Sequence, residues 1–177
     1  MRVPLEHIKP QVISINISKG GIPKLPVDSI RILFKGLAGD GHNHEKHNNP
    51  LQAVCLQDFE KIDELNQHGY SLLPGMTGEN LTVRNLNINC LPLGTTLKFS
   101  GGVAMEISKV RKPCYVMDAI HLKLKEDALD RHGMYAKVIQ EGMLTTGETI
   151  EVIRPSIELC TTNGIKFKKT KRPACPA

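Results

Sequence analysis

Short stretches in which apolar and polar residues alternate, separated by glycine and proline turns, most constrain the fold of this chain. Residues 11–18 (QVISINIS) alternate in this way, and a Gly-Gly turn follows them. Alternation with a period of two is the pattern of a strand that is buried on one face. Further stretches that read as strands are residues 26–34, 51–56, 91–100, 103–110, 131–140 and 149–153. Six or seven short strands with one to three short helices predict a mainly β domain, folded as a closed or partly open β-barrel.

The composition supports this prediction. The chain has no tryptophan and only 4% aromatic residues, so valine, isoleucine and leucine must build the core, and these residues favour strands. Its 177 residues suit one domain, which we expect over residues 1–154. Residues 155–177 are rich in lysine, and we expect them to form a basic, flexible tail. Such tails are more often solvated than bound to nucleic acid, so a nucleic-acid partner is not favoured.

Several classes of protein do not fit the sequence. No apolar stretch approaches the roughly 20 residues that span a bilayer, and the first residues lack the apolar region of a signal peptide. The five cysteines form no CxxC pairs, which argues against a disulfide framework or a structural zinc site and favours a reducing cytoplasm. The common nucleotide-binding and hydrolase motifs are absent from the sequence.

The clearest helix signal follows Asp58, which is a plausible N-cap. Phe59, Ile62 and Leu65 then recur at helical spacing, and Gly69 ends the segment. Residues 118–129 predict a second helix, and residues 141–148, with two glycines, predict a tight turn.

One cysteine lies in an unusual local sequence. The strand predicted over residues 103–110 runs directly into Arg111-Lys112-Pro113-Cys114. Neighbouring cations stabilise a thiolate, which is a nucleophile, a sulfur carrier and a soft metal ligand. The alternative interpretation is a structural cysteine at the end of a strand.

Two loops also concentrate polar groups. The loop over residues 36–50 contains Asp40 and three histidines, His42, His44 and His47, which are candidate zinc ligands or a solvated polar surface. In residues 73–83, two glycines free the backbone to approach a ligand, and Glu79-Asn80 precede a strand. A turn with an Asx-type cap has the same composition, so both interpretations stay open here.

A series of short motifs runs through the chain in a fixed order. They are residues 36–42 (GLAGDGH), 78–81 (GENL), 93–95 (LGT), 105–108 (MEIS), 112–114 (KPC), 131–138 (RHGMYAKV), and 142 with 147–148 (G and GE). Together they resemble the MOSC domain family, named for the C-terminal domain of molybdenum cofactor sulfurase. The resemblance extends over about residues 12–152 and indicates a small stand-alone bacterial member.

The resemblance implies a barrel similar to that of the pyruvate kinase β-barrel domain and a pocket for the molybdenum cofactor, molybdopterin. This cofactor can be absent from purified protein, and the family is also associated with pyridoxal phosphate binding. In relatives the matching cysteine, here Cys114, ligates molybdenum or carries sulfur. The other residues that the resemblance and the local chemistry assign to cofactor binding are Asp40, His42, Gly78, Glu79, Asn80, Arg111, Lys112 and Arg131.

Three functions are compatible with these residues. In the first, Cys114 holds molybdenum, and the protein reduces N-hydroxylated compounds with electrons from a separate reductase. In the second, Cys114 carries the cofactor or a persulfide sulfur for a cofactor-biosynthesis partner, without turnover. The third is a metal-dependent hydrolase that uses Asp40, His42, His44 and His47, and it is the least favoured because the resemblance accounts for Asp40 and His42 without zinc.

Overall fold

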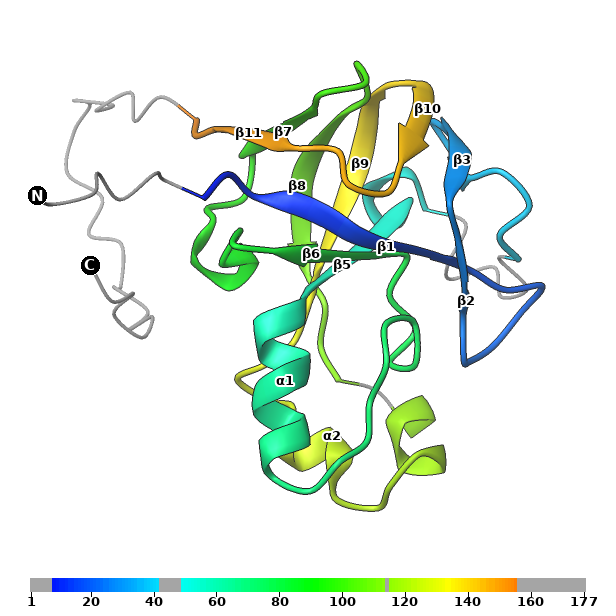
Figure 1. The fold of residues 1–177 in the computed structure, drawn as a ribbon, viewed down its shortest axis with the longest axis vertical. Coiled ribbons are helices and arrows are strands. Elements are labelled where there is room, and N and C mark those ends of the chain that lie inside the picture. The colour runs from blue at the N-terminus through cyan, green and yellow to red at the C-terminus, as the bar shows by residue number, and fades with distance from the viewer. Residues whose placement is uncertain (1–7, 42–48, 114, 156–177) are drawn as a thin grey trace, which may run out of the picture.

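The computed structural model describes residues 8–41, 49–113 and 115–155. The chain forms one large and one small sheet (Figure 1). The strands of the large sheet are β1 (Gln11–Ile17), β2 (Leu25–Val27), β5 (Val54–Asp58), β6 (Leu81–Arg84), β7 (Thr96–Phe99), β8 (Ala104–Val110), β9 (Met134–Gln140) and β11 (Ile150–Ile153). Their order in the sheet is β11-β7-β8-β9-β5-β6-β1-β2. The small sheet has the order β10-β3-β4, with β3 at Ser29–Leu33, β4 at Gly36–Leu37 and β10 at Gly142–Thr145.

The large sheet curls until its first and last segments meet. Gln11 forms an isolated antiparallel bridge with Thr149. On either side, the Val12 N–H donates to the Glu148 carbonyl at 2.9 Å, and the Ile150 N–H donates to the Pro10 carbonyl at 2.7 Å. The result is a partly open β-barrel, and the predicted fold class is confirmed.

Aliphatic side chains fill the barrel, as the composition predicts. Every strand of the large sheet except β2 contributes at least one buried apolar residue. Residues with no exposed surface include Val12, Ile15, Leu56, Leu81, Leu97, Met105 and Ile107.

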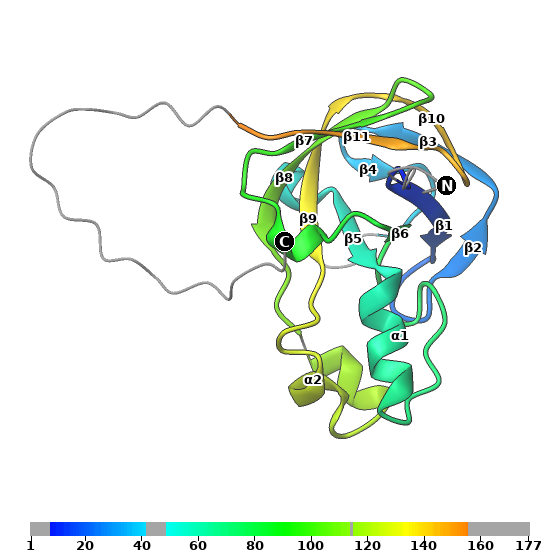
Figure 2. The ribbon, with the colours of Figure 1, turned by 60° about the vertical axis from the view of Figure 1, so that its left-hand side comes forward.

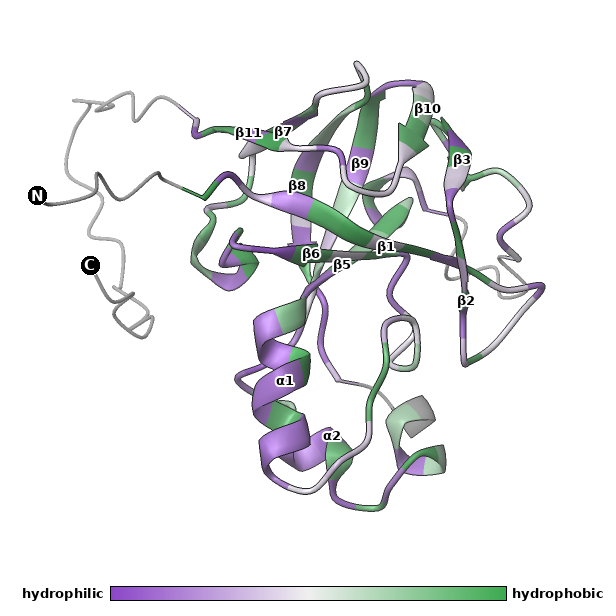
Figure 3. Cartoon of the chain, in the orientation of Figure 1, coloured by the Kyte–Doolittle hydropathy of each residue, from purple (hydrophilic) through white to green (hydrophobic). Residues whose placement is uncertain are grey.

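Helices occupy one end of the molecule (Figures 1 and 2). They are α1 (Phe59–Gln67), α2 (Leu124–Asp127) and the 3-10 turn η4 (Tyr115–Ala119), while the turns η2 (Pro50–Gln52) and η3 (Ile88–Cys90) lie in loops. The helical end has its own small core of Ile62, Leu65, Leu72, Met117, Leu124 and Ala128. The outer face of α1 is largely hydrophilic (Figure 3), and no helix in the described ranges is long and apolar enough to cross a membrane.

Several predicted elements differ in extent from those observed. The α1 helix follows its predicted N-cap Asp58, and Gly69 follows its end with a φ of +97°. Residues 26–34, predicted as one strand, divide at Asp28 into parts of β2 and β3 in different sheets. The segment predicted as a turn at 141–148 contains β10, which pairs with β3. The second predicted helix is reduced to α2, which has four residues, preceded by η4.

Candidate functional site

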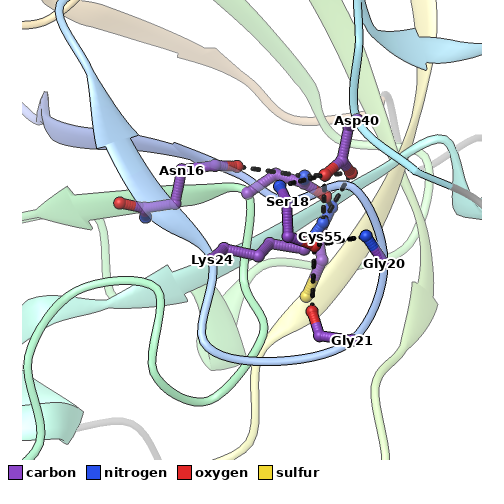
Figure 4. Close-up of polar contacts among 8 residues, drawn as sticks. Asn16, Ser18, Gly20, Gly21, Lys24, Asp40 and Cys55 are labelled. Atoms are coloured by element: carbon purple, nitrogen blue, oxygen red, sulfur yellow. Dashed lines mark hydrogen bonds and ion pairs between the residues drawn. The ribbon is translucent and has the colours of Figure 1, made fainter.

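The loop that contains Asp40 meets the loop that follows β1 and the loop that precedes β6. Asp40 forms hydrogen bonds with both of these loops (Figure 4). Its side chain is only 2% exposed and forms an ion pair with Lys24, whose Nζ lies 2.6 Å from Oδ1 and 2.5 Å from Oδ2. Oδ1 also accepts a hydrogen bond from the Ser18 N–H at 2.9 Å, and Oδ2 accepts one from Asn80 Nδ2 at 2.8 Å. Both oxygens of this carboxylate are therefore engaged within the protein.

The side chain of Asn80 connects this loop to two strands. Its Oδ1 accepts from the Cys55 N–H of β5 at 3.1 Å, while Nδ2 donates to the Asn16 carbonyl of β1 at 3.3 Å as well as to Asp40. Asn80 is buried, and every polar atom of its amide has a partner. It therefore fixes the loop of Asp40 against the barrel.

Glu79 is completely buried and organises the loop that precedes β6. One carboxylate oxygen accepts from the Gly75 N–H at 2.6 Å and from the Thr82 hydroxyl at 2.9 Å, and the other accepts from the Thr77 hydroxyl at 2.7 Å. Gly75 has a φ of +84°, and a Cβ there would lie 2.3 Å from the Lys24 carbonyl oxygen. The loop therefore needs glycine at this position, both for its backbone angle and for its packing.

Arg111 lies against the same loop. Its guanidinium Nη2 donates to the Thr77 carbonyl, and its backbone N–H donates to the Gly133 carbonyl at 3.0 Å. The residue is only 8% exposed, whereas the neighbouring Lys112 is exposed. A Cβ on Gly78 would lie 3.4 Å from Nη2, so the loop backbone passes directly beside the cation.

The structure brings most of the described candidate residues into one region. Asp40 contacts Asn80, and Thr77 links Glu79 to Arg111. Arg131 belongs to the helical end instead, where its Nε lies 3.0 Å from Glu64 Oε2 and its Nη1 donates to the Asp127 carbonyl.

The remaining candidates cannot be placed in this way. Cys114, His42, His44 and His47 lie outside the described residues, so their predicted roles stay predictions. Within the ranges that are described, no group of three or more His, Cys, Asp or Glu residues could hold a metal ion.

Sequence reasoning missed two residues. Lys24, the partner of Asp40, lies in a turn whose local pattern gives no sign of a buried ion pair. Asp58 was predicted only as an N-cap, yet its carboxylate makes no capping hydrogen bond and accepts from the Ile88 N–H instead. Burial raises the pKa of Asp58 from 3.8 to about 7, against the lowering effect of that hydrogen bond.

Comparison with known families identifies the fold. The model of the MOSC domain matches residues 43–151, more than half of the chain. The chain belongs to the MOSC domain family. The motif at residues 36–42, which contains Asp40, precedes the matched range, and the other motifs that resemble the family lie within it.

Solved structures support the same MOSC fold. YuaD from Bacillus subtilis is 19% identical with a TM-score of 0.70, and the match covers 82% of this chain and 96% of YuaD. YiiM from Geobacillus stearothermophilus is 22% identical with a TM-score of 0.70, covering 84% of this chain and 77% of that one. YiiM from Escherichia coli is 20% identical with a TM-score of 0.60, covering 84% and 71%. A comparison with curated proteins gave no match.

Proposed function

We propose that this MOSC protein binds the molybdenum cofactor, with Cys114 as a metal ligand, and reduces N-hydroxylated compounds with electrons from a separate donor. Family membership supports the cofactor, because the family takes its name from molybdenum cofactor sulfurase. The observation that carries the proposal is the buried Arg111, held against a glycine-containing loop three residues before Cys114.

The donor set fits this cofactor. Arg111 and Lys112 supply positive charge for the pterin phosphate, and arginine suits phosphate through its planar donor fork. A Cβ on Gly78 would lie 3.0 Å from Ile22 Cγ2 and 3.4 Å from Arg111 Nη2, so glycine lets the loop backbone lie close beside the cation. A cysteine thiolate is the soft ligand that molybdenum bound by dithiolene sulfurs accepts. When bound, the cofactor supplies two-electron redox chemistry at the metal.

The buried carboxylate and amide side chains of the site have a structural role in this proposal, not a role in binding the cofactor. Asp40, Glu79 and Asn80 use their side chains on other protein groups, so we assign them to holding the loops in place. Lys24 neutralises the charge of Asp40 within the same assembly.

Metal and pterin analysis tests the cofactor assignment directly. The protein is produced in a host that makes the molybdenum cofactor, together with Cys114→Ala and, as a control, Cys175→Ala, which lies outside the range matched by the family model. About one molybdenum per chain is expected in the wild type and the control, and loss is expected in Cys114→Ala. Equal molybdenum in all three proteins would exclude Cys114 as the ligand, and zinc in its place would favour the histidine-rich loop.

Two further measurements distinguish the proposed reductase activity from the alternative function as a sulfur carrier. A host without its own N-hydroxylamine reductase is tested for tolerance to N-hydroxylated bases, and protection that requires Cys114 supports the reductase. For the carrier, a cysteine desulfurase persulfide transfers its outer sulfur to the Cys114 thiolate and is left as a thiol. One added sulfur at Cys114 by mass spectrometry, without protection of the host, would replace the reductase with the carrier.

A further inference from the structure

We propose that residues 117–129 form a cap, which opens as one unit while both sheets stay folded and, when closed, stabilises the loop that accepts Arg111. The cap comprises the end of η4, all of α2 and the turns beside them, and it lies in the connection between β8 and β9 (Figures 1 and 2). Such an opening needs no bound cofactor, so it goes beyond the proposed function and is measured separately from it.

The backbone of the cap is hydrogen-bonded to itself. Its N–H groups that have backbone acceptors among the described residues, from Ile120 to Leu129, donate only to carbonyls between Met117 and Glu126. Strand β8, in contrast, pairs with β7 on one side and with β9 on the other. No backbone ladder in the described chain therefore ties the cap to a sheet, and the cap can move without breaking one.

Side chains hold the cap closed. Met117, Leu124 and Ala128 are at most 4% exposed and pack with α1 in the small core of the helical end. That core is separate from the barrel core, which contains many more buried residues. Tyr70 adds a hydrogen bond of 2.6 Å from its hydroxyl to Asp127 Oδ2. A unit with few buried apolar contacts opens at a lower free energy than a large core.

The connection is fixed to the barrel on both sides of the cap. Before the cap, the Arg111 N–H donates to the Gly133 carbonyl at 3.0 Å. After it, Gln57 Nε2 of β5 donates to the Arg131 carbonyl at 2.7 Å. Because these contacts lie outside residues 117–129, the cap can open without separating β8 from β9.

Met76 links the cap to the candidate site. Its side chain is partly buried against the core of the helical end, and its N–H donates to the Leu73 carbonyl at 3.1 Å. The carbonyl of the next residue, Thr77, accepts from the guanidinium of Arg111. Opening of the cap removes packing from Met76 and so loosens the backbone that holds Arg111.

Native-state hydrogen exchange of the full chain without cofactor, followed by NMR, tests the opening. The matched variants are Leu124→Ala in the cap core and Leu97→Ala in the barrel core, both at fully buried positions. Leu97→Ala weakens the barrel equally in the closed and the cap-open protein. It is expected to speed exchange in β8 and β9 by at least about thirtyfold and to leave the cap amides within about twofold of the wild type. Equal acceleration of the cap amides would overturn the proposal, because the cap would then open only with the barrel.

Leu124→Ala weakens only the closed cap. It is expected to speed exchange of the cap amides, and of Met76 in the loop, by at least about thirtyfold. The control is Leu122→Ala, at an 85% exposed position in the same segment, which is expected to change these rates by less than about twofold. If either buried variant does not fold, Ala128→Gly and Ile107→Val give the same comparison with effects of about three- to tenfold. Unchanged exchange at Met76 when the cap amides accelerate would overturn the link to the loop.

Discussion

Replacing Asp58 by asparagine is expected to stabilise the protein at neutral and alkaline pH. Asp58 is 1% exposed at the junction of β5 and α1. Its Oδ2 accepts from the Ile88 N–H at 2.7 Å, while Oδ1 has no hydrogen-bond partner among the described residues. Burial raises its pKa to about 7, and repulsion from Glu60 adds to the shift. Asparagine keeps the shape and one acceptor oxygen but never ionises.

The expected magnitude follows from the pKa change. The folded protein retains the Asp58 proton up to about pH 7, whereas the unfolded chain loses it near pH 3.8, so this group lowers stability progressively as pH rises between those values. A difference of about three units, at roughly 1.4 kcal/mol each, gives a cost of about 4 kcal/mol above pH 7. The stabilisation by Asp58→Asn should therefore grow from under about 1 kcal/mol at pH 4 to about 4 kcal/mol at pH 8.

Urea denaturation at pH 4, 6 and 8 measures this difference. The matched control is Asp63→Asn, an exposed aspartate on the same helix, which is expected to change the free energy of unfolding by less than about 0.5 kcal/mol without a pH trend. A variant at position 58 that is no more stable than the wild type at pH 8, or whose advantage does not depend on pH, would refute the reasoning.

Three other changes test separate contacts. Asp40→Asn leaves the ammonium of Lys24, 12% exposed, without its counter-charge and is expected to cost about 3–5 kcal/mol in urea denaturation. Adding Lys24→Met should recover part of that loss, and additive costs would contradict the pairing. Gly133→Ala places a Cβ 2.2 Å from a backbone carbonyl of β5 and should lower stability by about 1–3 kcal/mol, visible as a lower Tm. A hydrogen bond to Asp127 raises the pKa of Tyr70 to about 12, so Asp127→Asn should return it toward 10 in an ultraviolet titration; no change would exclude that hydrogen bond as the cause.

Most strands could be predicted from apolar residues close together in the sequence, and β10 could not. In β1 the apolar residues at every second position predict the strand, although the polar Ser14 and Asn16 are buried beside Ile15 and the register shifts between Val12 and Ser14. β10 has one buried residue, Leu144. Its short segment between Gly142 and Gly147 has the composition of a turn. Its pairing with β3, more than 100 residues earlier, carries no local signal.

The candidate site was predictable in part. The motifs single out Asp40 and Asn80, the local charge pattern singles out Arg111, and the structure brings all three to neighbouring loops. From residue chemistry alone, the loop before β6 could be interpreted either as a turn or as a ligand-binding loop. What decides the role of each polar side chain is its partner, and these partners are distant in sequence: Asn80 bonds to Asn16, 64 residues earlier. Lys24 was missed for the same reason, since no pattern in its own turn indicates Asp40.

The meeting of the first and last strands has a consequence for how the molecule assembles. Pro10 and Ile150 are hydrogen-bonded across nearly the whole described chain, so direct formation of this contact closes a long loop at a cost in entropy. Contacts so distant in sequence form slowly. The join between β1 and residues 147–150 consists of one bridge and its flanking hydrogen bonds, whereas β8 and β9 pair along their whole lengths. We therefore expect this join to form late in folding.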